Sequence, residues 1–224
     1  DADGDGVDAC YDSVESMLRD QSLDIAILCM WGVFHAPVGI ELAQTGRVRA
    51  ILCEKPFTQT ADEARQLANA ATESGVLIAE AFKFRHHPMH LRAQALVDSG
   101  AIGRLLSVRS TFCASVAESN RKPELNWRFN RAQGGGSIYD LACYNIHHAR
   151  AAFGEEPQRV FAAQISGVEV DDAASIALAF DGGRTAQISV GFNAWSSQYA
   201  ELVFDEGSLF VEQAWNNENQ AVSL

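Results

Sequence analysis

The sequence is poor in positive charge and in long apolar runs. Lys and Arg together number 17 against 29 Asp and Glu, which gives a formal net charge of −12. A protein this acidic repels phosphate backbones and anionic lipid headgroups. No uninterrupted apolar run reaches the ~18–20 residues that a membrane-spanning helix needs. We therefore expect no nucleic-acid partner and no membrane partner.

The cysteines also lack a pattern. There are five of them, an odd number with wide spacings and no C-x-x-C motif, which is not typical of a disulfide scaffold. This indicates a reducing compartment, and we expect the protein in the cytoplasm. Apolar residues make up 47% of the chain and charged residues 21%, which excludes long disorder and fibrous classes. The chain starts at Asp1 without Met or a signal-like stretch, so we expect the native protein to begin upstream.

The first part of the chain alternates between strand-like and helix-like segments. Apolar runs predict buried strands, and the segments between them have helical signals such as the capping box Thr60-Ala-Asp-Glu63. The expected strands cover 24–29, 48–53 and 76–81, and the expected helices cover 36–45 and 60–74. This β-α-β-α-β order predicts a doubly wound parallel sheet.

The second part has a different rhythm. Helices are expected at 88–98 and 138–153, an irregular stretch at 115–136, and strands at 105–112, 158–166, 173–180, 184–192 and 199–204. Asp181-Gly-Gly183 is a hairpin signal, which makes its flanking strands antiparallel. The predicted fold class is therefore α/β plus α+β. A partial doubly wound domain covers 1–83, and an α+β domain with a largely antiparallel open sheet covers 84–224.

Glu54-Lys55-Pro56 directly follows the expected strand 48–53. Ligands of open α/β sheets bind at the carboxyl ends of the strands, where a lysine can stabilise negative charge on a reacting oxygen. Pro56 permits a cis bond after Lys55, and we expect one. The alternative is a solvated turn with a surface lysine.

A second candidate site begins at three glycines, Gly134 to Gly136, and continues into the expected helix. On that helix Asp140, Tyr144, His147 and His148 share one face. A tyrosine near a lysine cation can act as a proton donor, because the cation lowers its pKa. The alternative is a half-buried amphipathic helix whose polar groups make packing hydrogen bonds.

Two metal-like patterns are incomplete. The segment from Asp1 to Gly6 opens like a calcium loop, but Asp8 and Asp12 stand where an apolar residue and a Glu belong. Pro88 separates His86 from His90, and no carboxylate or cysteine completes a zinc site. We expect no metal.

Five motifs in order resemble the Gfo/Idh/MocA (glucose–fructose oxidoreductase / inositol dehydrogenase) family of NAD(P)-dependent oxidoreductases. They are Cys53-Glu-Lys-Pro-Phe57, Glu80-Ala-Phe-Lys-Phe-Arg-His-His-Pro88, Ser99-Gly-Ala-Ile-Gly103, Asn126-Trp-Arg128 and Gly134-Gly-Gly-Ser-Ile-Tyr-Asp-Leu-Ala-Cys-Tyr144. The resemblance implies a Rossmann domain and a substrate domain. It also implies hydride transfer between NAD or NADP and a sugar, cyclitol or similar polyol. A homo-oligomer, a dimer or tetramer through the C-terminal sheet, is implied as well.

The resemblance also assigns roles to residues. Lys55 matches the catalytic lysine, Asp140 the aspartate that orients substrate hydroxyls, and Tyr144 the acid/base position. Lys55 and Tyr144 should then face one cleft. The implied cofactor-binding residues are Trp31, His35, Glu54, Lys55 and Pro56. Arg128 and His148 are implied as substrate-binding residues.

One family feature is missing from the sequence. No G-x-G-x-x-G occurs, so the first βαβ unit and the acidic residue that reads the cofactor ribose are absent. The choice between NAD and NADP therefore stays open. An alternative function also stays open: a non-catalytic or cofactor-deficient family member that serves as a sugar-binding or oligomerisation module.

Overall fold

The computed structural model describes residues 6–216. These belong to two compact units, one up to Ala81 and one from Phe82 onward. The sequence places the boundary after residue 83, within the short 3-10 turn Lys83–His86.

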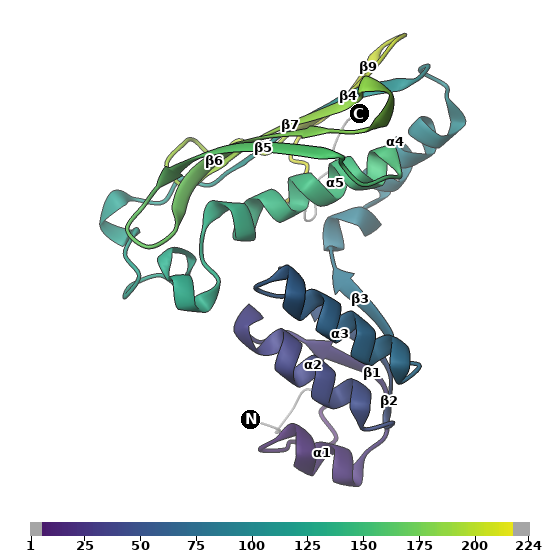
Figure 1. The fold of residues 1–224 in the computed structure, drawn as a ribbon, viewed down its shortest axis with the longest axis vertical. Helices are drawn as coiled ribbons and strands as arrows, with labels where there is room; N and C mark the ends of the chain where they lie inside the picture. Colours follow the sequence, from purple (N-terminus) through teal and green to yellow (C-terminus); the bar gives the residue numbers. More distant parts are fainter. Residues whose placement is uncertain (1–5, 217–224) are drawn as a thin grey trace. The chain divides into compact units, whose positions relative to one another are not determined.

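The first unit is a three-stranded sheet in the order β1-β2-β3 with helices between the strands (Figure 1). Its elements are α1 (Val14–Asp20), β1 (Leu23–Leu28), α2 (His35–Gln44), β2 (Val48–Glu54), α3 (Ala61–Glu73) and β3 (Leu77–Ala81). Both strand pairs are parallel, which confirms the predicted sheet. Helix α1 was not predicted; the Ser13 side chain caps its N-terminus.

The core of this unit lies between the helices and one face of the sheet. Gly39 lets α2 approach α3 closely there, because a Cβ at this position would lie 2.7 Å from the end of the Leu67 side chain of α3. The opposite face presents Ile25, Ile27 and Leu77, which are 61%, 61% and 76% exposed.

The second unit is a six-stranded sheet in the order β5-β6-β7-β4-β8-β9. Its elements are α4 (Pro88–Ser99), β4 (Leu105–Cys113), α5 (Cys143–Phe153), β5 (Arg159–Ser166), β6 (Asp171–Ala179), β7 (Thr185–Gly191), β8 (Ala200–Phe204) and β9 (Ser208–Val211). All neighbouring strands are antiparallel except β4 and β7. The predicted largely antiparallel open sheet is confirmed, and β9 is an addition to it.

The helices α4 and α5 lie along one side of this sheet (Figure 1). Aliphatic side chains of the strands, such as Val108 and Leu202, are buried on that side. Trp215 is fully buried with them, and its Nε1–H donates to the Thr111 carbonyl oxygen at 2.8 Å. The indole therefore joins the end of the described chain to the middle strand β4.

The helices of both units are short. Among the described residues α3 has 13 residues and α4 has 12, whereas a membrane span needs about 20. Nowhere in residues 6–216 does a helix combine the length and the apolarity that crossing a membrane requires.

Candidate active site

The first candidate element is the turn that follows β2. The Lys55–Pro56 peptide bond is cis, as the sequence predicts. Lys55 and Pro56 are half-buried and Glu54 is exposed. The Lys55 N–H donates to the Glu54 carboxylate at 3.2 Å. The turn therefore presents a lysine at the carboxyl end of a parallel strand, where ligands of such sheets bind.

Two neighbouring segments hold this turn through its backbone. His35 is 1% exposed, and its ring nitrogens lie 3.1 Å from the Pro56 carbonyl oxygen and 3.0 Å from that of Met30. An imidazolium can donate both bonds, whereas a neutral imidazole donates only one. On the other side, the Phe57 N–H donates to the Glu80 carboxylate of β3 at 2.9 Å. His35 is thus buried and joins the loop after β1 to the turn after β2.

The loop after β1 presents apolar side chains beside the same turn. Met30, Trp31 and Phe34 are 38%, 54% and 53% exposed. Gly32 lies so close to the Pro56 turn that a Cβ there would be 3.8 Å from the Pro56 carbonyl oxygen. A flat apolar ring and a lysine at a strand's carboxyl end fit the nicotinamide end of a dinucleotide. The phosphate-binding end has no counterpart, since the sequence contains no G-x-G-x-x-G.

Cys53, near the end of β2, is fully buried. Burial, followed by the charges of Glu80 and Glu54, raises the pKa of its thiol to about 12. The reactive form of a cysteine is the thiolate. The Cys53 Sγ lies 3.5 and 3.6 Å from the carbonyl oxygens of Glu54 and Phe57, within reach of its single S–H, and this adds to the contacts that hold the turn.

In the second unit, the glycine-rich segment before the helix sets the positions of the candidate site residues. A Cβ at Gly135 would lie 2.6 Å from the Arg128 carbonyl oxygen, so no other residue fits there. The Gly136 N–H donates to the same oxygen at 2.8 Å. Gly136 has φ +115, a conformation that a side chain disfavours. The backbone of Arg128 is thereby joined to the start of the following helix.

That helix begins with a π-helical turn, Ile138–Ala142, ahead of α5. The sequence predicted an ordinary helix from Ile138, and π-turns occur frequently at functional sites. Asp140 lies in this turn and is 4% exposed. The Arg128 Nε–H donates to its Oδ2 at 2.8 Å. The structure therefore brings together two predicted site residues that are 12 positions apart.

Tyr144 follows on α5 among aromatic rings. It is half-buried, and its ring lies 5.5 Å from Phe82 and 5.3 Å from Phe112, both edge-on. Phe84 lies at 5.8 Å in a tilted arrangement. These contacts fix the plane of the phenol, and an apolar surrounding strengthens electrostatic interactions made by its polar end.

His147 is anchored at both its ring face and its ring edge. The ring stacks on Phe82 at 4.2 Å, and Arg85 Nη1 lies 3.2 Å from its Nε2. A guanidinium only donates, so Nε2 is the acceptor and the imidazole is neutral. Burial, with the charges of Arg85 and Arg150, lowers the pKa of His147 to about 4.

His148 is buried beneath this surface, against Phe84 and Trp215. Burial, followed by the neighbouring His90, lowers its pKa to about 3. In the part of the chain that the structure describes, its Nε2 has no hydrogen-bond partner. A cavity of ≈ 50 Å³ lies beside it. A direct contact of His148 with substrate stays a prediction.

Lys55 lies in the first unit and Tyr144 in the second, and a common cleft for them stays a prediction. Asp171, which hydrogen-bonds the start of the π-turn, was not predicted from the sequence. Arg85 and Phe82 were not predicted as site residues either, although both lie in a segment that resembles the family. No local sequence signal marks Asp171.

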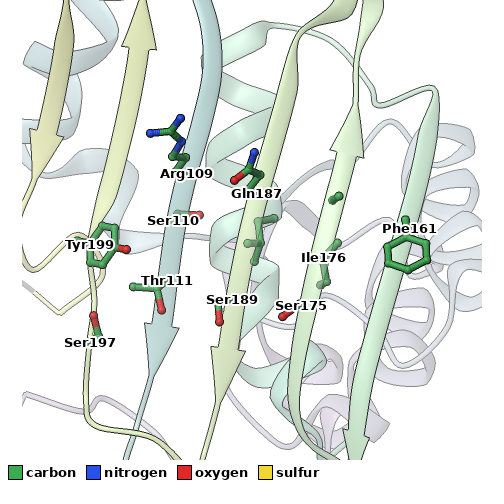
Figure 2. A pocket seen from close by; sticks show the side chains of 12 residues that line it. Arg109, Ser110, Thr111, Phe161, Ser175, Ile176, Gln187, Ser189, Ser197 and Tyr199 are labelled. Carbon is green, nitrogen blue, oxygen red and sulfur yellow. The ribbon is translucent and has the colours of Figure 1, made fainter.

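A groove of ≈ 560 Å³ crosses the face of the six-stranded sheet that α4 and α5 leave uncovered (Figure 2). The residues that line it include Arg109, Thr111, Phe161, Ser175, Gln187 and Tyr199. Phe161 and Tyr199 are 71% and 38% exposed. The centre of this face thus has short polar side chains, with aromatic rings toward its sides.

Metal-binding residues do not cluster in residues 6–216, where no three His, Cys, Asp or Glu side chains are placed to hold an ion. The calcium-like segment falls mostly on residues 1–5, outside the described residues. His86 is exposed, whereas His90 is buried and its Nε2 donates to the Ala214 carbonyl oxygen at 2.7 Å.

Comparisons with known proteins bear on both units. The D-xylose 1-dehydrogenase (NADP(+)) 2 of Haloferax volcanii is 33% identical over 217 residues, which cover 96% of this chain and 64% of that protein. The levoglucosan dehydrogenase of Pseudarthrobacter phenanthrenivorans is 30% identical over 141 residues, 62% of this chain and 35% of that protein. This chain therefore spans less than two thirds of these relatives.

Solved structures are similar over nearly the whole chain. The aldose-aldose oxidoreductase from Caulobacter crescentus, complexed with glycerol, has a TM-score of 0.85 and 25% identity over 95% of this chain and 63% of its own. A levoglucosan dehydrogenase in complex with NADH and levoglucosan has a TM-score of 0.83 and 25% identity over 94% and 62%.

Family models match the two units in turn. Residues 2–82 match the oxidoreductase family with the NAD-binding Rossmann fold, and residues 90–210 match the GFO/IDH/MocA C-terminal domain. With a parallel sheet that ends in a cis Lys55–Pro56 turn and an open sheet behind Asp140 and Tyr144, the chain belongs to the GFO/IDH/MocA family of oxidoreductases.

Proposed function

We propose that the protein is an NAD(P)-dependent oxidoreductase that transfers a hydride between nicotinamide and a hydroxyl-bearing carbon of a sugar, cyclitol or similar polyol. The observation that carries the proposal is the turn from Glu54 to Phe57. It places Lys55 at the carboxyl end of β2 and is held by His35 and Glu80. Because these contacts hold the backbone of the turn, Lys55 should keep one position during the reaction.

The three proposed catalytic residues have separate tasks. The bound nicotinamide supplies the hydride acceptor or donor. Lys55 polarises the reacting oxygen through its positive charge, and Tyr144 exchanges the hydroxyl proton. Asp140 orients a neighbouring hydroxyl, and Arg128, which donates to that carboxylate, holds it in place. His148 belongs to the substrate side in this proposal, where it supports the aromatic cluster around Tyr144.

The cofactor-side residues are Trp31, His35, Glu54, Lys55 and Pro56. Trp31 offers an exposed ring on which the nicotinamide can pack, and His35 holds the loop that carries it. Either NAD or NADP is compatible, since the residue that would select between them is not in the sequence.

Neutral sugars fit this protein better than sugar phosphates. The formal net charge of −12 makes a further phosphate on the substrate, beyond those of the cofactor, less favourable. The names of the relatives point the same way, since they refer to xylose and levoglucosan. We infer an aldose or a related neutral polyol as the substrate.

The test uses the full-length protein with NAD⁺ and NADP⁺ against a panel of neutral sugars and polyols. We expect kcat/KM of Lys55→Ala to fall by about 10²–10³-fold, because one charge-stabilising group is lost. Lys122→Ala removes an exposed lysine and should match the wild type. Equal rates for wild type and Lys55→Ala would refute the site. Absence of NADH and NADPH binding in a calorimetric titration would instead favour the non-catalytic alternative.

We also infer that the open face of the six-stranded sheet joins two copies of this chain. Arg109 and Glu201 form an ion pair on that face, so the surface carries both charges that a two-fold interface can exchange. Ser189 is exposed on the same face. Ser189→Arg should lower the mass measured by analytical ultracentrifugation, and Glu206→Arg, outside the groove, should not. An unchanged mass in Ser189→Arg would refute this interface.

A reducing compartment such as the cytoplasm is the setting we infer. All five cysteines are free and lie within the described residues, with Cys10 and Cys29 exposed. Exposed free thiols persist where the glutathione and thioredoxin systems keep them reduced.

A further inference from the structure

A buried carboxylate from a distant strand caps the helix that carries the proposed catalytic groups. Asp171 is the first residue of β6 and is 8% exposed. Its Oδ2 accepts a hydrogen bond from the Ser137 hydroxyl at 2.5 Å and from the Ile138 N–H at 3.0 Å. Ser137 is itself fully buried. These two donors come immediately before and at the first residue of the π-turn.

The same carboxylate occupies the space beside Gly136. A Cβ at Gly136 would lie 2.5 Å from Asp171 Oδ1. The Gly136 carbonyl oxygen in turn accepts the Asp140 N–H at 3.0 Å. The Asp171 carboxylate therefore lies against Gly136 and hydrogen-bonds Ser137 and Ile138. Asp140 is joined to the same segment through its own N–H.

Other contacts tie the β5–β6 connection to the irregular segment, but at different places. The Arg131 N–H donates to the Glu169 carboxylate at 2.9 Å, and Arg121 lies 3.9 Å from Asp172. Both hold residues that precede the glycines. Asp171, by contrast, hydrogen-bonds the start of the helix itself.

A desolvated carboxylate is costly unless its hydrogen bonds repay the loss of water. Here the Asp171 carboxylate accepts the Ile138 N–H, which has no acceptor within the helix because it lies in the first turn. The helix dipole also favours negative charge at this end. The placement of catalytic groups is sensitive, because a displacement of about 1 Å can cost ~10²-fold in rate. A rigid contact at the start of the helix thus affects every group further along it.

We propose that Asp171 is a positioning residue: its carboxylate sets where the π-turn begins and thereby where Asp140 and Tyr144 lie. It acts through Ser137 and Ile138 and touches no reacting atom. The catalytic part of this inference rests on the proposed function, whereas the structural part does not.

The test compares Asp171→Ala, Asp171→Asn and Asp172→Ala in the full-length protein. Amide hydrogen exchange of peptides covering 134–144 reports the structural part without any substrate. We expect faster exchange in Asp171→Ala alone. Asp171→Asn should restore protection, because its side-chain oxygen can accept the same two bonds. Asp172→Ala is the matched control, since its carboxylate faces Arg121 and not the helix.

The kinetic readout is the split between kcat and KM on the best neutral sugar of the panel. We expect kcat of Asp171→Ala to fall by about 10–10²-fold with the KM for the nicotinamide cofactor unchanged. Asp171→Asn should recover to within a few-fold of wild type. If Asp171→Ala does not fold, Ser137→Ala removes only one of the two bonds and should lower kcat a few-fold with the same exchange signature.

Two results would overturn the inference. One is unchanged exchange and unchanged kcat in Asp171→Ala and Ser137→Ala. The other is an Asp171→Asn variant as impaired as Asp171→Ala. If the wild type turned over no sugar, the proposed function would fail, and the exchange experiment would still decide the structural role of Asp171.

Discussion

The two units hold their candidate catalytic residues by different means. In the first, His35 and Glu80 bind the backbone of the turn that carries Lys55. In the second, Arg128 binds the side chain of Asp140 directly, and aromatic rings surround Tyr144. The contacts of His35 and Glu80 thus fix the path of the chain, and those of Arg128 and the aromatic rings reach the functional groups themselves.

This difference affects how the stability of each unit responds to pH. The contacts of the first turn run mostly to carbonyl oxygens and N–H groups, so a lost contact should loosen the loop. In the second unit, histidines with lowered pKa values are packed among the rings. The stability of that unit should therefore depend on pH. Variants and pH changes can separate these two kinds of support.

The largest expected effect is from His35→Ala in the first unit. It removes the ring that contacts the carbonyl oxygens of Met30 and Pro56 and opens a cavity. Together these losses should cost about 3 kcal/mol. Chemical denaturation, with hydrogen exchange resolved by peptide, should show the loss in residues 30–57. Gln44→Ala, at an exposed position of the same helix, is the control. Equal stability of the two variants would show that His35 does not hold these two loops together.

The next effect is acid destabilisation of the second unit. Burial lowers the pKa of His148 to about 3 in the folded protein, from an ordinary value of 6.5. The unfolded chain therefore binds the proton first, so stability is full above pH 6.5 and falls as the pH drops toward 3. Between pH 7 and 5 the loss is about 2 kcal/mol by linkage. Denaturation at both pH values measures it.

Two variants sharpen this pH test. His148→Leu should remove most of the slope of stability against pH in this range. His86→Gln changes an exposed histidine and should leave the slope as it is. An unchanged slope in His148→Leu would show that His148 does not carry the effect, and would shift it to His90 and His147.

The smallest expected effect is from Thr60→Ala in the first unit. Thr60 caps α3 in a reciprocal capping box with Glu63, and its loss should cost about 1 kcal/mol. Exchange should rise in α3 and stay unchanged in α5, since the two helices belong to different units. Gln66→Ala, at an exposed position in the middle of α3, should not destabilise. Faster exchange in both units would show that they unfold together.

Much of the fold follows from local signals. Apolar runs predicted the three parallel strands, and Asp181-Gly-Gly183 predicted the hairpin between β6 and β7, which pair antiparallel. The cis bond before Pro56 was expected and is present. These features depend on neighbours in the sequence, so residue type and spacing are enough to reveal them.

Other features escaped prediction because they depend on distant partners. The strands β4 and β7 pair in parallel, although more than 70 positions separate Ser107 from its partner Thr185. His148 shares a helical face with Tyr144, and that pattern did not reveal that His148 is buried. The π-turn is likewise set by contacts from outside its own segment.

The sequence alone determined most strands and helices, although not α1 or β9. It also determined the lysine at a strand end and the aspartate and tyrosine on one helix. Their spacing is local, and the backbone period fixes which side chains share a face. Only the tertiary structure decided that Arg128 binds Asp140 and that Asp171 caps the helix start. Those contacts exist because folding desolvates the charged groups, and a buried charge must find a partner wherever the chain brings one.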